Sequence, residues 1–231
     1  MGMILVAACP GGNISNFMSQ LSKANTELSV TLTAITTLVS PIFTPANFAI
    51  WGGLYVNFVN PEAGSALREL HIDIYQMFET VFILLGLPLV VGILVSHYLP
   101  KVAQKLKKPM QYFSILFFIM MVVLAFGNNV DLFLKYIGFI FILVLIHNGL
   151  ALSTGFGMAT IFKLPFADRR TLTIETGIQN SGLGLVLLFN PKIFPPDLAI
   201  GGMLFITAWW GIWHIISGLS VSLIFSRWYK D

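Results

Sequence analysis

The sequence has few charged residues and a single cysteine. Of its 231 residues, 10% are Asp, Glu, Lys or Arg, whereas soluble domains carry about 25% charged residues. This shortage excludes a domain that faces water on every side. The single cysteine, Cys9, excludes a disulfide within the chain. The short apolar run before Cys9 has no basic stretch ahead of it, so we expect no signal peptide or lipoprotein cleavage site and expect the chain to begin inside a helix.

Long apolar runs are abundant instead. Charged residues are absent from Met110 to Asn129, from Tyr136 to Phe162 and from Leu198 to Ser226. A helix needs about 20 residues to cross the hydrocarbon core of a bilayer, and lipid cannot solvate free backbone groups, so these runs must be helical. The sequence predicts an all-α polytopic membrane protein.

The apolar runs and the polar segments between them predict seven membrane segments, two of which are broken. The expected segments are residues 2–22 with a break at 9–12, 26–52, 76–99, 110–127, 132–162, 171–190 with a break around 179–182, and 198–226. The expected turns and loops are residues 23–25, 53–73, 101–109, 128–131, 163–170 and 191–197.

The basic residues predict the orientation of these segments. Because cytoplasmic loops are enriched in Lys and Arg, we place the loop at 101–109 in the cytoplasm and alternate the sides along the chain. The cytoplasmic side then holds Lys23, Lys101, Lys105, Lys107, Lys108, Lys163, Arg169, Arg170, Arg227 and Lys230, and the outer side holds Arg68, Lys135 and Lys192. We therefore expect a cell-membrane protein with a cytoplasmic C-terminus, and the net charge of +3 indicates topology rather than nucleic-acid binding.

The two broken segments combine helix breakers with side-chain oxygens. The first is CPGGNISN at residues 9–16, and the second is ETGIQNSGLG at residues 175–184. Discontinuous helices at corresponding places in two halves of a chain are typical of transporters, in which they form a binding site near the bilayer midplane. The sequence predicts such a site here.

Glu175 is the main candidate residue, because a carboxylate at membrane depth is costly unless it is paired or coordinated. Gln179 lies four residues later and shares its helix face. In the first half of the chain, Ser15 and Asn16 follow the glycine pair, and Ser29 and Thr33 share a face of the next span. One carboxylate among neutral oxygens suits a hard monovalent cation such as Na⁺.

Other interpretations of these residues remain open. Ser29 and Thr33 could bond backbone carbonyls of their own helix or join helices together, and Glu175 could carry protons. His147 and His214 are interpreted as packing residues or as hydrogen-bonding partners between helices. A Ser181–His214 dyad of an intramembrane hydrolase would require the two side chains to lie within hydrogen-bond reach.

Four motifs resemble the bile acid:sodium symporter family. ACPGGNISN and ELSVTLTAITTLVSPIFTP resemble its fourth and fifth helices, IETGIQNSGLG its ninth and WHIISG its tenth. The resemblance covers nearly the whole chain and implies a remnant of a ten-helix inverted-repeat transporter with two crossing discontinuous helices, lacking the first three helices. It divides the chain into core residues 1–52, panel-like residues 53–127 and core residues 128–231.

The resemblance also assigns site residues. It implies one sodium site made of Ser15, Asn16, Ser29, Thr33 and Glu175. A second site would use Glu175, Gln179 and the carbonyls of Thr176 and Ile178. Asn180 and His214 would lie near the substrate cavity.

The implied function is sodium-coupled symport of an organic anion, either bile-acid-like or a small carboxylate, by alternating access. The expected partners are this anion, Na⁺ and the lipid bilayer, without an organic cofactor or nucleic acid. The family's second site also takes a glutamine from its third helix, and Ile215 stands where the family often has Asn. We therefore expect that the chain alone does not transport. The alternatives are a non-functional fragment and a proton-coupled carrier or channel.

Overall fold

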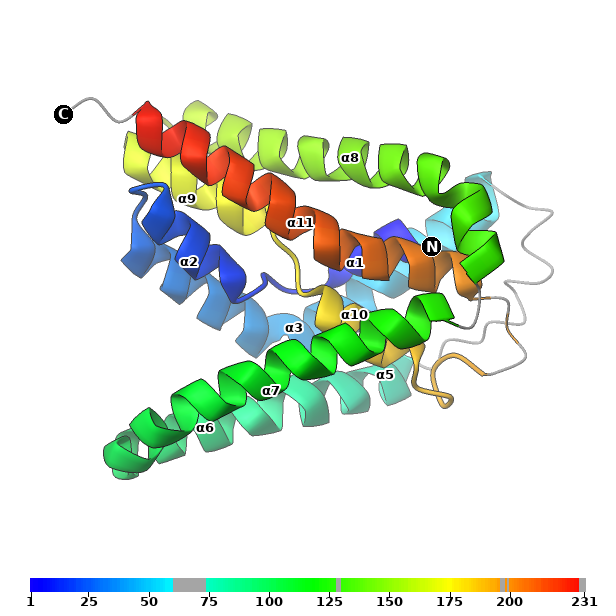
Figure 1. Ribbon diagram of the computed structural model, residues 1–231, viewed down its shortest axis with the longest axis horizontal. Helices are drawn as coiled ribbons and strands as arrows, with labels where there is room; N and C mark the ends of the chain where they lie inside the picture. Colours follow the sequence, from blue (N-terminus) through cyan, green and yellow to red (C-terminus); the bar gives the residue numbers. More distant parts are fainter. Residues whose placement is uncertain (60–73, 128–129, 196–197, 199, 229–231) are drawn as a thin grey trace.

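The computed structural model describes residues 1–59, 74–127, 130–195, 198 and 200–228, and these residues are almost entirely helical (Figure 1). The elements are α1 (Gly2–Ala8), α2 (Ile14–Leu21), α3 (Thr26–Leu54), η1 (Tyr55–Val59), α5 (Ile74–Val81), η2 (Phe82–Gly86), α6 (Leu87–Tyr98), α7 (Pro100–Gly127), α8 (Val130–Ile161), α9 (Phe166–Gly177), α10 (Ser181–Leu188) and α11 (Gly201–Arg227). The described part of the chain contains no strand, so the predicted all-α class is confirmed.

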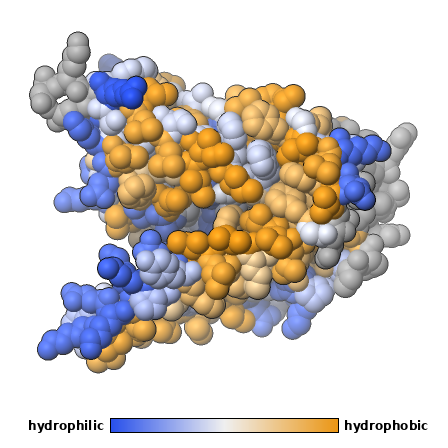
Figure 2. All heavy atoms as spheres, in the orientation of Figure 1, coloured by the Kyte–Doolittle hydropathy of each residue, from blue (hydrophilic) through white to orange (hydrophobic). Residues whose placement is uncertain are grey.

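Five stretches of helix are long and apolar enough to cross a membrane. They are Thr26–Phe58, Tyr75–Tyr98, Pro100–Gly127, Phe133–Ile161 and Gly201–Arg227. Many large apolar side chains on α6, α7 and α8 are exposed, as expected for surfaces in contact with lipid tails. Figure 2 shows hydrophobic residues over the middle of the molecule and hydrophilic residues at its two ends, which confirms a polytopic membrane protein.

The two predicted helix breaks are present, and they cross each other. α1 ends at Ala8 and α2 begins at Ile14, while α9 ends at Gly177 and α10 begins at Ser181. Pro10 has no N–H to donate, and Cys9 before it takes up the extended conformation that proline favours in the preceding residue, which ends the first helix. The extended backbone of each break pairs with the other.

The pairing at the crossing is antiparallel. Gly12 N–H donates to the carbonyl of Ile178 at 2.9 Å, and Asn180 N–H donates to the carbonyl of Pro10 at 2.8 Å. A side chain from α8 satisfies a further group, since Asn148 Nδ2 donates to the carbonyl of Gly177 at 2.8 Å. The structure thereby supplies partners for backbone groups that lipid could not solvate.

Small residues allow the helices near this crossing to pack closely. A Cβ atom on Gly155 of α8 would lie 2.5 Å from the carbonyl oxygen of Leu172 in α9. Membrane helices commonly approach one another at such residues because apolar association in lipid depends on close van der Waals contact. Gly155 therefore brings α8 against the helix that carries Glu175.

Helices α5, α6 and α7 form a layer beside the other helices (Figure 1). This layer packs against α3, α10 and α11. Figure 2 shows that the surface is hollowed at the left, between the α6–α7 hairpin and the helices above it. The predicted boundaries of core and panel, the ten-helix plan and the inverted repeat stay predictions.

The predicted basic loops are wrong in their extent. The 101–109 segment is helical, because α7 runs from Pro100 to Gly127. Proline is well suited to the first turn of a helix, and the Lys, Gln and Leu residues that follow have high helix propensity. The predicted loop at 163–170 is shorter than expected because α9 begins at Phe166.

Three other boundaries also differ. Helical structure continues from α3 through η1 to Val59, so the predicted loop at 53–73 does not start at 53; its residues 60–73 lie outside the described part. Asp131 is helical in α8, whereas residues 128–129 of that predicted turn are not described. The last span begins at Gly201 rather than at 198, and residues 196–197 and 199 are likewise outside the described part.

The junctions that carry basic residues lie at one end of the molecule. The α2–α3, α6–α7 and α8–α9 junctions and the C-terminal end of α11 all lie at the left of Figure 1. These junctions contain or adjoin Lys23, Lys101, Lys163 and Arg227. The hollow seen in Figure 2 opens at this same end.

Candidate ion site at the helix crossing

Glu175 lies near the C-terminal end of α9, where three hydroxyl groups from two other helices meet its carboxylate. Ser15 of α2 donates to Oε1 at 2.5 Å, and Thr33 of α3 donates to Oε2 at 3.0 Å. Ser29 of α3 also donates to Oε1. All three hydroxyl-bearing residues are buried, so a carboxylate at membrane depth is held by hydrogen bonds.

Asn16 adds an amide oxygen to this cluster. Its Oδ1 lies 2.9 Å from the Ser29 hydroxyl and 3.3 Å from the Thr33 hydroxyl. Each hydroxyl has a single proton, so Ser29 and Thr33 cannot donate fully to both the amide and the carboxylate. The cluster therefore holds more acceptor capacity than its hydroxyl protons satisfy, together with one negative charge, and its chemistry fits a bound cation.

The local structure explains why these oxygens meet. Ser29 and Thr33 are four residues apart on α3 and share one face. Gly11, in the first break, lets the backbone approach the carboxylate, because a Cβ atom there would lie 3.2 Å from Glu175 Oε2. The C-terminal end of α9 carries the negative end of its helix dipole, which also favours a cation.

The second predicted ligand set is assembled only in part. Gln179 Nε2 donates to the carbonyl of Thr176, and the carbonyl of Ile178 accepts from Gly12 N–H. Gln179 Oε1 is buried and, among the described residues, has no hydrogen-bond partner. No hydrogen bond joins Gln179 to Glu175 in that part of the chain, so the structure leaves an unsatisfied oxygen here rather than a complete ligand set.

The two predicted substrate residues lie on different elements. Asn180 caps α10, since its Oδ1 accepts from Leu183 N–H at 3.0 Å. His214 is buried on α11, and its Nδ1 has no partner within the described residues. No hydrogen bond in that part of the chain joins Ser181 to His214, so the structure provides no hydrolase dyad.

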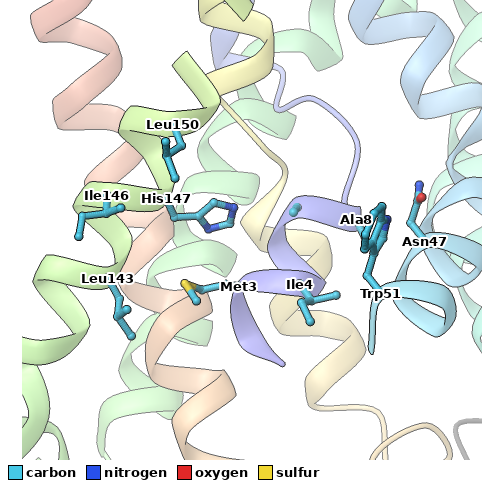
Figure 3. A pocket seen from close by; sticks show the side chains of 10 residues that line it. Met3, Ile4, Ala8, Asn47, Trp51, Leu143, Ile146, His147 and Leu150 are labelled. Atoms are coloured by element: carbon cyan, nitrogen blue, oxygen red, sulfur yellow. The ribbon is translucent and has the colours of Figure 1, made fainter. Parts of the chain in front are cut away.

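A cavity of about 540 Å³ lies between α1, α3 and α8 (Figure 3). Its walls are mostly apolar, with polar groups from Asn47, Trp51 and His147. The rings of His147 and Trp210 are tilted by 51° with their centroids 4.8 Å apart, so His147 makes a packing contact of the kind expected for it. The sequence offered no sign of the cavity, because an apolar helix face looks the same whether it meets lipid, a helix or a void.

A second cavity of about 770 Å³ lies between the α5–α7 layer and the end of α10. It is lined by polar as well as apolar side chains, including Glu79, Thr80, Asn190 and Lys192. Asn190 Nδ2 donates to Thr80 Oγ1 at 3.3 Å across this boundary. Sequence reasoning did not identify this cavity, because its polar residues come from separate segments.

The site residues are oxygen donors, and the described part of the chain holds no group of three or more His, Cys, Asp or Glu residues that could bind a metal ion together. Hydroxyl, amide and carboxylate oxygens are ligands that suit hard cations. Such ligands do not select the softer transition metals.

The chain is similar to known transport proteins over most of its length. The model of the Sodium Bile acid symporter family matches residues 1–136. The uncharacterized sodium-dependent transporter YocS of Bacillus subtilis is 30% identical over 98% of this chain and 64% of its own length. The probable sodium/metabolite cotransporter BASS2 of Oryza sativa is 26% identical over 90% of this chain and 49% of its own length. Human sodium/bile acid cotransporter 4 is 26% identical over 88% of this chain and 44% of its own length.

Proposed function

The chain belongs to the sodium bile acid symporter family, and from this premise we propose that it binds Na⁺ at the Glu175 cluster and serves sodium-coupled symport of an organic anion. Family membership confirms the predicted relationship, and the relatives are described as transporters rather than enzymes. The chain spans less than two thirds of the length of the relatives named above, so the activity of the whole protein is part of the proposal.

The observation that carries the proposal is the convergence of five oxygen-bearing side chains from three helices. The cluster consists of Ser15, Asn16, Ser29, Thr33 and Glu175. A single carboxylate balances a monovalent cation, whereas sites for divalent cations commonly use several carboxylates. The unsatisfied Gln179 Oε1 supports a second ion position beside the first.

The fold supports alternating access by movement of the α5–α7 layer against the rest of the molecule. The two broken helices are bonded to each other through their backbones, so they would move as one unit. The hollow beside the α6–α7 hairpin opens at the basic end of the molecule, and the positive-inside rule assigns that end to the cytoplasm. We propose that this arrangement is inward-open and that the C-terminus is cytoplasmic.

The proposed substrate is an organic anion of the bile-acid or metabolite classes named for the relatives. Asn180 and His214 are proposed to face it. Binding of Na⁺ would fix the geometry of the crossing and supply positive charge near an anion. It would also drive the conformational change, because a ligand shifts a conformational equilibrium by its different affinity for the two states.

The test is the melting temperature of the detergent-purified chain in NaCl and in KCl at equal ionic strength. Glu175→Gln is the test variant, and Glu27→Gln is the matched control because Glu27 is exposed in the first turn of α3. At an ion concentration 100 times the Kd, binding stabilises a protein by about 2.7 kcal/mol. We expect a sodium-specific rise that Glu175→Gln abolishes and Glu27→Gln retains. Equal melting in the two salts would refute the proposal.

A further inference from the structure

Helices α2 and α3, which supply most of the proposed ion ligands, are held against α9 at the basic end of the molecule. The turn between α2 and α3 lies against the first half of α9 there (Figure 1). Three side chains make the joint: Asn25 in the turn, and Arg170 and Thr171 on α9. None of them is among the predicted ion or substrate ligands.

Arg170 contributes a buried charge to this joint. Its side chain is 2% exposed, and Nη1 donates to the carbonyl of Ser22 at 3.1 Å and to that of Lys23 at 3.5 Å. Its guanidinium lies over the ring of Phe166, 4.5 Å from the centroid. A buried cation requires compensating partners, and the carbonyls at the C-terminal end of a helix carry partial negative charge. Arg170 thus fixes the end of α2 to α9.

Asn25 and Thr171 add a second connection. The Thr171 hydroxyl donates to the carbonyl of Asn25 at 2.9 Å. Asn25 Nδ2 in turn donates to Asp168 Oδ1 at 2.8 Å, while its own Oδ1 accepts from Leu28 N–H at 3.0 Å. The same amide group therefore caps the start of α3 and anchors that start to α9.

The joint lies about one helical turn from the ion ligands. Ser29 follows Asn25 by four residues on α3, and Glu175 follows Thr171 by four residues on α9. We infer that Arg170, Asn25 and Thr171 are positioning residues: they hold α3 against α9 at the spacing at which the hydroxyls of α3 reach the carboxylate. This inference rests on the proposed sodium site and assigns it a set of supporting residues.

The first experiment is a sodium titration of the melting temperature of the purified chain. Arg170→Lys keeps the positive charge but loses the planar guanidinium geometry, and Arg169→Lys is its matched control because Arg169 Nε bonds the nearby carbonyl of Leu164. Thr171→Val removes the hydroxyl of the second connection. Its control is Thr173→Val, since the Thr173 hydroxyl bonds the carbonyl of Arg169 in its own helix.

We expect Arg170→Lys and Thr171→Val to raise the apparent Kd for Na⁺ about tenfold each, in the range found for residues that are coupled through a shared backbone shift. The two controls should leave that Kd within about twofold of the parent value, as expected for uncoupled sites. A purely structural joint would lower the melting temperature equally in both salts and leave the sodium titration unchanged. That result would overturn the inference.

A second measurement separates this inference from the proposed function. In a Cys9→Ser background, Ser29→Cys combined with Glu175→Cys places one thiol on α3 and one on α9, at positions whose native side chains are hydrogen-bonded. The rate of disulfide formation then reports the spacing of α3 and α9 without any ion. We expect Arg170→Lys to slow this cross-link and Arg169→Lys to leave it unchanged. An unchanged rate in Arg170→Lys refutes the positioning role, whereas a parent chain that shows no sodium response refutes only the proposed sodium site.

Discussion

Replacement of Ser29 by alanine removes one hydroxyl from the buried cluster around Glu175. That hydroxyl donates to Glu175 and lies 2.9 Å from Asn16 Oδ1. Without it, Oε1 of the carboxylate keeps only the Ser15 hydroxyl. Because hydrogen bonds to charged groups contribute about 1.5–3 kcal/mol, and each kcal/mol corresponds to about 2–4 °C for a chain of this size, the melting temperature in KCl should fall by roughly 3–12 °C.

The effect of Ser29→Ala on sodium binding is a separate observable. Loss of one oxygen ligand should weaken Na⁺ about tenfold, which corresponds to about 1.4 kcal/mol. The assay is the same sodium titration of melting temperature, with Ser220→Ala as the control for the same chemical change. The Ser220 hydroxyl is exposed and bonds the carbonyl of Ile216 in its own helix at 2.8 Å. If the two variants behave alike in both salts, the reasoning about the carboxylate cluster is refuted.

Three further predictions use the same assay. Gly11→Ala should weaken sodium-specific stabilisation because the carboxylate of Glu175 must shift by a few tenths of an ångström to admit the methyl group, whereas Gly53→Ala, which has open space around it, should retain it. Asn148→Leu leaves a buried backbone carbonyl unsatisfied and should cost about 1–3 kcal/mol in both salts; an unchanged melting temperature would contradict that role. Asn180→Ala removes the cap of α10 and should cost about 1 kcal/mol, measured in KCl.

The membrane class and the two helix breaks were predictable from sequence because their physical causes are local. Long uncharged runs require lipid, and the Pro–Gly–Gly at residues 10–12 interrupts hydrogen bonding wherever it occurs. The shared face of Ser29 and Thr33 likewise followed from helical periodicity. Their meeting with Glu175 depends on how α3 packs against α9, and the residues themselves do not specify that distance.

The errors in the prediction have physical causes as well. Basic residues were equated with loops, but Lys and Gln are good helix formers, so α7 extends past the apolar run to Pro100. Arg170 was assigned to topology by its charge alone, whereas the structure buries it against backbone carbonyls. The cavities were missed because each is lined by segments distant in sequence.

The hydrogen bonds that join the two broken helices at their crossing also constrain the order in which the protein can fold. Ser15 and Glu175 are separated by 160 positions, and the backbone bonds of Gly12 and Asn180 join the same distant segments. Contacts between such distant positions form late, because the intervening chain must be ordered before they can close. The hydroxyls of α2 and α3 therefore enter the membrane without their carboxylate partner, and the site is completed only after α9 has been synthesised.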